Sequence, residues 1–193
     1  MSAATTTPPR HLTRLPAPAG SRTVAVGAAA GCWALLALRL GADPALPAYL
    51  YLAVLGVALA RIDVSRQRLP DALTLPAYPI TAALLAVAAL TGARSGNLPR
   101  ALLGGIALLA VYGGIRLVHP PGMGLGDVKL AGVLGMAAAW PGWDSWTLAL
   151  MAPFLLGTAG NLLLLARRRA GLGTQLPFGP YMLAGTLLAV LLS

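Results

Sequence analysis

The chain has 193 residues, of which 58% are hydrophobic and 10% charged, and it carries a net charge of +9. A soluble domain has about a quarter charged residues, so this composition excludes a water-soluble globule. The apolar residues form blocks approaching the ~20 residues that cross a hydrocarbon core. The basic residues stand between these blocks, and the aromatic residues are scattered. We therefore predict an all-α, polytopic membrane helix bundle embedded in the lipid bilayer, with no nucleic-acid partner.

The chain divides into a short polar tail and a long apolar region. Residues 1–22 are rich in Thr, Pro and Arg without a hydrophobic period, which predicts a disordered cytosolic tail. Residues 23–193 are predicted to be one transmembrane domain of about seven helices, with a range of six to eight because some blocks are short. The predicted helices cover 23–41, 45–61, 72–92, 100–118, 128–142, 145–166 and 177–193.

The basic residues predict the orientation in the membrane. With the tail inside the cell, eleven of them fall on the cytoplasmic side and three on the other. The eleven are Arg10, Arg14, Arg22, Arg61, Arg66, Arg68, Arg116, Lys129, Arg167, Arg168 and Arg169, and the three are Arg39, Arg94 and Arg100. The positive-inside rule then places the N-terminus in the cytoplasm and Ser193 on the outer side.

The acidic residues are five aspartates and no glutamate. Asp43 and Asp144 fall in predicted outer loops, where a solvated surface charge explains them. Asp63, Asp71 and Asp127 fall at the inner face. Asp63 follows the second predicted helix and Asp127 precedes the fifth, so two crossings separate them. The two therefore share a side of the membrane, whichever way the protein is inserted.

Each inner aspartate also has a structural interpretation. Asp71 follows a proline and precedes an apolar helix, and we interpret it as an N-cap. Asp127 has the same kind of position, which suits a cap and a reactive group equally. Asp63 closes a helix, where the dipole disfavours a carboxylate by about 0.3–1 kcal/mol. An ion pair with Arg61 or Arg66 would offset that cost, but an acid at a membrane boundary is a functional candidate by default.

Two carboxyl groups on one face suit peptide hydrolysis by acid–base catalysis. One ionised carboxylate takes a proton from water while its protonated partner polarises the scissile carbonyl, and close carboxylates share one proton. The helix fields alone predict that Asp127, at a helix start, is the resting base. They predict that Asp63, at a helix end, is the resting acid.

Three segments resemble the motifs of bacterial prepilin (type IV leader) peptidases, which are membrane aspartic proteases of the GxGD type. Residues 124–129 (GLGDVK) resemble the GxGDxK signature, 62–71 (IDVSRQRLPD) the first motif, and 176–180 (LPFGP) the late turn. The resemblance implies that Asp63 and Asp127 are the catalytic aspartates.

The other motif residues have expected supporting roles. Gly124 and Gly126 leave room for a substrate backbone. Lys129 points away from Asp127 on a regular helix, so we expect it to reach the headgroups or an acidic residue of the substrate. Pro177, Phe178 and Gly179 are expected to form a helix-start turn that shapes the site.

The resemblance also implies the setting of the reaction. The substrates would be prepilins or pseudopilins, cut at the cytoplasmic face of the bacterial inner membrane, with contacts to pilus or secretion machinery. Cys32 is the single cysteine, so the paired CxxC zinc motifs of longer members are missing. We expect a short, peptidase-only form without metal or cofactor.

Two other functions suit parts of this pattern. A presenilin-like intramembrane protease also uses a GxGD motif. A small transporter or channel would use Asp63 and Asp127 to bind ions or carry protons.

Overall fold

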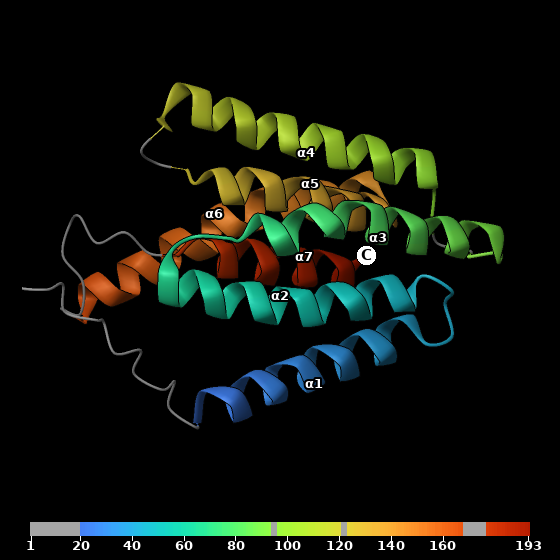
Figure 1. The fold of residues 1–193 in the computed structure, drawn as a ribbon, viewed down its shortest axis with the longest axis horizontal. Coiled ribbons are helices and arrows are strands. Elements are labelled where there is room, and N and C mark those ends of the chain that lie inside the picture. The colour runs from blue at the N-terminus through green and yellow to red at the C-terminus, as the bar shows by residue number, and fades with distance from the viewer. Residues whose placement is uncertain (1–19, 94–95, 121–122, 168–176) are drawn as a thin grey trace, which may run out of the picture.

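The computed structural model describes residues 20–93, 96–120, 123–167 and 177–193, and these form seven α-helices without strands (Figure 1). The helices are α1 (Gly20–Leu40), α2 (Leu46–Arg66), α3 (Asp71–Leu90), α4 (Leu98–Val118), α5 (Leu125–Ala139), α6 (Trp143–Ala166) and α7 (Gly179–Leu192). Each predicted apolar block corresponds to one helix, so the predicted all-α bundle is confirmed. The first helix begins three residues before its predicted start, and the rest of the predicted tail, 1–19, lies outside the described residues.

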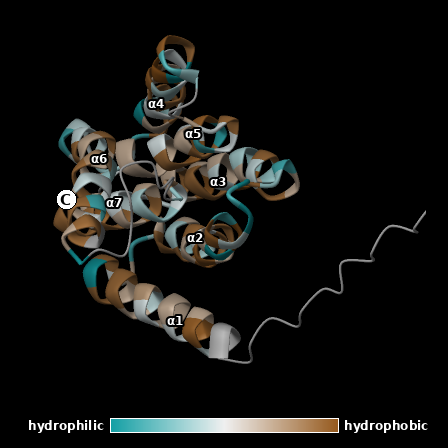
Figure 2. Ribbon diagram, turned by 90° about the vertical axis from the view of Figure 1, so that its left-hand side faces the viewer, coloured by the Kyte–Doolittle hydropathy of each residue, from teal (hydrophilic) through white to brown (hydrophobic). Residues whose placement is uncertain are grey.

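Five of the helices, α1 to α4 and α6, are long and apolar enough to cross a membrane. Helices α5 and α7 have 15 and 14 residues, fewer than the ~20 that a full crossing requires. Hydrophobic residues occur along all the helices (Figure 2), and many large hydrophobic side chains are exposed. For example, 67% of Ile106 and 68% of Leu155 are exposed, as expected where lipid replaces water. The chain is therefore a multi-pass membrane protein.

Helix α5 is the most buried element of the bundle. Eleven of its 15 residues are buried, and it contacts α3, α4, α6 and α7. A helix that is apolar all round can satisfy its surface only inside a bundle or in lipid. The other helices thus fix the position of α5, and with it the position of the GxGD segment at its start.

Glycines bring α4 and α5 into close contact. A Cβ atom on Gly135 of α5 would lie 2.5 Å from the carbonyl oxygen of Gly104 and 2.8 Å from the Cβ of Leu108, both on α4. The indole of Trp146 on α6 donates a hydrogen bond of 2.9 Å to that same carbonyl oxygen. In lipid, where apolar burial gives little driving force between helices, such small residues allow the backbone packing that holds helices together.

The last turn of α2, the start of α3 and the start of α5 lie at the same end of the bundle (Figure 1). Gln67 ends α2 in the left-handed conformation, with φ of 48°. Its N–H donates a 2.7 Å hydrogen bond to the carbonyl of Asp63. Pro70 then precedes the first residue of α3. This tight connection places the two halves of the first motif beside the start of α5.

We expect Gly135→Ala to destabilise the protein by about 1–3 kcal/mol, because the added methyl overpacks the contact between α4 and α5. Gly114→Ala on α4 is the matched control, because its Cβ would meet no atom within 4 Å. Thermal unfolding in detergent measures both. Equal unfolding temperatures for the two variants would contradict the close contact.

Candidate active site

Asp63 lies in the last turn of α2, where only 5% of the residue is exposed. The prediction that Asp63 follows a helix ending at residue 61 is wrong, because α2 continues to Arg66, but Asp63 does lie at the end of the helix. Its Oδ2 atom accepts a buried hydrogen bond of 3.0 Å from the backbone N–H of Gly179, the first residue of α7. A free N–H at a helix start is well suited to a carboxylate. The late motif therefore contacts Asp63 directly.

The late turn is a helix start, as predicted. Phe178 is the N-cap of α7, Pro180 stands in the first turn, and Pro177 precedes them. A proline in the first helical turn sacrifices no hydrogen bond, because the N–H groups there have no partner within the helix. The turn thus leaves the N–H of Gly179 available for Asp63.

Asp127 lies in the first turn of α5, which begins at Leu125, three residues before its predicted start, so that Asp127 is inside the helix rather than before it. Its Oδ2 atom accepts a hydrogen bond of 3.3 Å from the backbone N–H of Gly124, the N-cap residue. The negative charge of Asp63 acts on Asp127, and a Cβ atom on Gly126 would lie 2.7 Å from the Cβ of Leu69, so the GxGD segment lies beside the first motif. Two segments 64 positions apart in the sequence therefore meet.

The charge of Asp127 is unfavourable in this site. Asp127 lies outside the five long spans. Burial in the first place, and then the negative charge of Asp63, raise the pKa of Asp127 to about 6, against the lowering effect of the Gly124 N–H. This raised pKa is opposite to the expectation that the field at the helix start makes Asp127 the resting base. Desolvation opposes the helix field and outweighs it.

The motif glycines stand against the two aspartates. A Cβ atom on Gly179 would lie 2.8 Å from Oδ2 of Asp63, and one on Gly124 would lie 2.9 Å from Oδ2 of Asp127. On Gly126 it would lie 2.7 Å from the Cβ of Leu69. Any side chain at these positions would push a carboxylate or the α2–α3 connection away. Besides the predicted room for a substrate, these glycines thus keep the carboxyl groups in place.

Asp71 and Lys129 form an ion pair between α3 and α5. The Nζ of Lys129 lies 2.7 and 2.8 Å from the two carboxylate oxygens of Asp71. The N-cap of α3 is Pro70, so the interpretation of Asp71 as an N-cap is wrong. Lys129 reaches Asp71 rather than the headgroups. The Asp71–Lys129 ion pair connects the first motif to the GxGD motif and does not involve Asp63 or Asp127.

Tyr112 of α4 is a site residue that the sequence reasoning did not identify. The residue is fully buried, and its hydroxyl has no hydrogen-bond partner among the described residues. It interacts electrostatically with Asp127, and its ring lies 6.3 Å from that of Phe178. The available signal was that Tyr112 carries the one hydroxyl group in the apolar block 100–118.

Fold and site together define a multi-pass helical membrane protein with two electrostatically coupled aspartates at one end of its bundle. The type IV leader peptidase family model matches residues 49–192, and the chain belongs to this family. This confirms the resemblance seen in the three motifs. Helix α1 lies before the matched region.

Several relatives bear the name prepilin leader peptidase/N-methyltransferase. The relative from Pseudomonas aeruginosa is 36% identical over 141 residues, which cover 70% of this chain and 46% of that protein. The relative from Burkholderia pseudomallei is 34% identical over 176 residues, covering 87% of this chain and 54% of that protein. The chain spans about half the length of the curated relatives it matches. No solved structure shows a significant match.

We expect Lys129→Asp to lower the stability of the protein by about 1 kcal/mol, because it replaces a partly exposed ion pair with two facing carboxylates. The double variant Asp71→Lys/Lys129→Asp should recover most of that loss, since it restores the pair in reverse. Thermal unfolding in detergent measures the three proteins. A double variant no more stable than the single one would show that the charge pair contributes nothing.

Proposed function

We propose that the protein is a membrane aspartic endopeptidase that removes the short basic leader from prepilin-like or pseudopilin-like substrates. The observation that carries the proposal is the coupled pair of Asp63 and Asp127, held at the start and end of different helices by backbone N–H groups. Family membership and the names of the relatives support it. The proposal covers cleavage alone and assigns the catalytic site to the predicted domain 23–193.

The pair would cleave the peptide bond by activating water. We assign the proton of the resting pair to Asp127, whose pKa is raised to about 6. Asp63 is then the base, because two close carboxyl groups share one proton. Asp63 takes a proton from the water molecule, and the water oxygen attacks the scissile carbonyl carbon. At the same time Asp127 gives its proton to the carbonyl oxygen. As the tetrahedral intermediate collapses, Asp63 gives its proton to the leaving amine nitrogen, Asp127 takes a proton back from a hydroxyl of the intermediate, and the C–N bond breaks.

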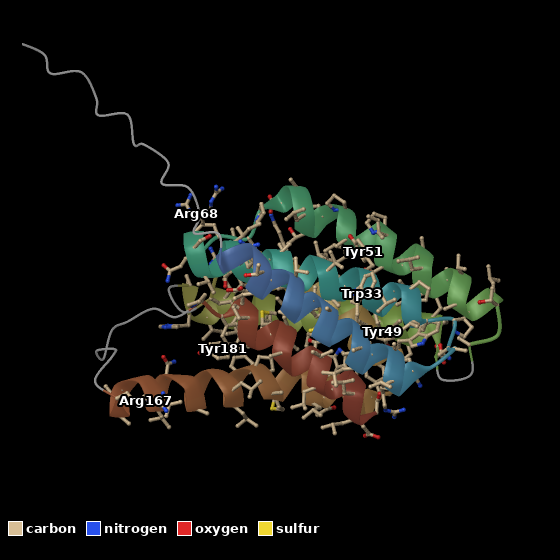
Figure 3. All side chains as sticks on the ribbon, turned by 90° about the horizontal axis from the view of Figure 1, so that it is seen from below. Trp33, Tyr49, Tyr51, Arg68, Arg167 and Tyr181 are labelled. Carbon is tan, nitrogen blue, oxygen red and sulfur yellow. The ribbon has the colours of Figure 1, made fainter. Side chains whose placement is uncertain are left out.

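We place this end of the bundle at the cytoplasmic face of the bacterial inner membrane. Arg68 and Arg167 lie toward the same end of the bundle (Figure 3), and Arg61 and Arg66 are on the last turns of α2. Such an excess of basic residues marks the cytoplasmic side. A basic leader that stays in the cytosol would reach the aspartates there.

Changing either aspartate to asparagine should abolish cleavage, with a loss of roughly 10²–10⁴-fold or more, because each amide removes one of the two proton-transfer groups. A prepilin-like substrate co-expressed with Asp63→Asn, Asp127→Asn or the wild type, followed by mass spectrometry of its N-terminus, measures this. Asp144→Asn is the matched control and should still cleave, because Asp144 lies in the first turn of α6, away from the pair. An Asp63→Asn or Asp127→Asn variant that cuts normally would refute the mechanism.

We expect the cleavage rate to fall as the pH rises through about 6, because Asp127 then loses the proton that the acid must donate. Below that pH the raised pKa keeps the carboxyl protonated, and Asp63 remains available as the base until it is protonated in turn. A pH–rate profile of the detergent-solubilised enzyme measures the transition, which belongs to the pair rather than to one residue. A rate that keeps rising to pH 8 would contradict the assignment of the proton to Asp127.

A further inference from the structure

A groove lies on the side of the bundle where α1, α2 and α7 meet over α5. Its volume is about 230 Å³, and no charged side chain is found among the described residues that line it. The lining includes the small residues Ala53, Gly56 and Ala60 of α2, and Cys32 of α1. Small residues at a helix surface in lipid allow another helix to approach closely.

The groove lies directly beyond the coupled aspartates. Three of its walls carry a residue of the candidate site at the same end of the bundle, each seven positions from a residue that lines the groove. The pairs are Gly56 with Asp63, Leu134 with Asp127, and Thr186 with Gly179. Seven residues make just under two turns, so each pair shares one helix face and is separated by about 10 Å. A chain that fills the groove and continues past its end therefore reaches the carboxyl groups.

Hydrogen bonds join the helices at the far end of the groove. Tyr49 lines it there, and its hydroxyl donates a 2.9 Å hydrogen bond to the carbonyl of Ala137 (Figure 3). The indole of Trp33 binds the carbonyl of Leu50 at 3.1 Å, and Arg39 binds that of Leu191 at 3.0 Å. These bonds attach the second half of α1 to α2 and α7.

Helix α1 separates from α2 at the end near the aspartates. Figure 1 shows that α1 diverges from α2 toward its own first residue, and Figure 2 shows α1 at the rim of the bundle. In that half of α1, 72% of Val24 and 70% of Val26 are exposed. An apolar segment can thus enter between α1 and α2 from the bilayer.

We propose that this groove binds the apolar transmembrane helix of the substrate, and the proposal rests on the function given above. The occupant is apolar because the lining carries no charge, and it is helical because a chain in lipid must satisfy its own backbone groups. It is part of the substrate because the three walls lead to the two aspartates. A lipid acyl chain also fits an apolar groove, but its position would bear no relation to a peptide bond.

The geometry sets a register for the substrate. The groove centre lies about seven helical residues, or about 10 Å, from the aspartates. The bond to be cut therefore lies about seven residues before the substrate residue that contacts the groove centre. Substrate residues about seven positions after the cleaved bond should therefore lie near Cys32, which lines the groove.

Cys32 makes the register measurable, since it is the one cysteine of the chain. Prepilin-like substrates carrying one cysteine each, at positions 3 to 14 after the cleaved bond, would be co-expressed with the Asp127→Asn variant and mildly oxidised in membranes. We expect disulfide crosslinks to peak near position 7 and to recur with a helical period. The matched control, Cys32→Ser/Leu103→Cys, moves the thiol to an exposed position on α4 and should give no such peak.

Cleavage of the same substrates by the wild type separates the outcomes. Cleavage without patterned crosslinks to Cys32 would overturn the groove proposal and leave the proposed function intact. Absence of both would overturn both. Uniform crosslinking at every position would indicate random contact in the bilayer and would also refute the register.

Filling the groove gives a second test. Ala53→Phe should raise KM for the substrate several-fold and change kcat little, because the added ring takes space from the guest helix without touching the aspartates. Ala89→Phe, on an exposed face of α3, is the matched control. An unchanged KM in Ala53→Phe would overturn the proposal.

Discussion

The carboxyl groups of Asp63 and Asp127 repel each other when both are ionised, and the fold must hold them together against that repulsion. They belong to α2 and α5. Helices α3 and α7 each contact both of these helices. Helix α7 holds Asp63 through the N–H of Gly179, and α3 holds the start of α5 through the Asp71–Lys129 pair. The spacing of the two carboxyl groups is thus set by these two intervening helices.

This arrangement explains why glycine is placed where it is. Gly179 and Gly124 bring backbone N–H groups up to the carboxylates, and a methyl group at either position would lie within 3 Å of an aspartate oxygen. Gly104 and Gly135 allow α5 to pack closely against α4. In a bundle with few polar contacts, glycines allow helix backbones to pack closely, and this close packing fixes the positions of the helices. The position of Asp127 therefore depends on contacts far along its own helix.

Much of the fold was predictable from the sequence, because apolar block length is a strong signal in a membrane protein. Each of the seven blocks became a helix, and the parity of crossings placed Asp63 and Asp127 on one side. The end of α2 was misjudged because residues 62–66 are polar enough to resemble a loop. Asp71 was interpreted as the N-cap of the helix that follows it, whereas its partner, Lys129, lies 58 positions away in the sequence. Such distant contacts leave no trace in local patterns.

The environment of each acid was harder to predict than its place. The dipole at a helix start lowers the pKa of a carboxyl group, and the sequence is enough to predict where helices start. Burial raises that pKa, and the extent of burial depends on how the helices pack. For Asp127, packing outweighs the field. The hydroxyl of Tyr112 was missed for the same reason, since a tyrosine inside an apolar block normally serves as core. That no residue in the described part of the chain bonds to this hydroxyl emerges only from the assembled helices.

Helix α1 forms one wall of the groove yet lies outside the region that matches the family, residues 49–192. No residue of α1 contributes to the hydrogen bonds that hold Asp63 and Asp127. Substitutions in α1 can therefore reshape that wall and leave the residues around the two aspartates unchanged, so differences in which substrates related proteins accept are best sought there.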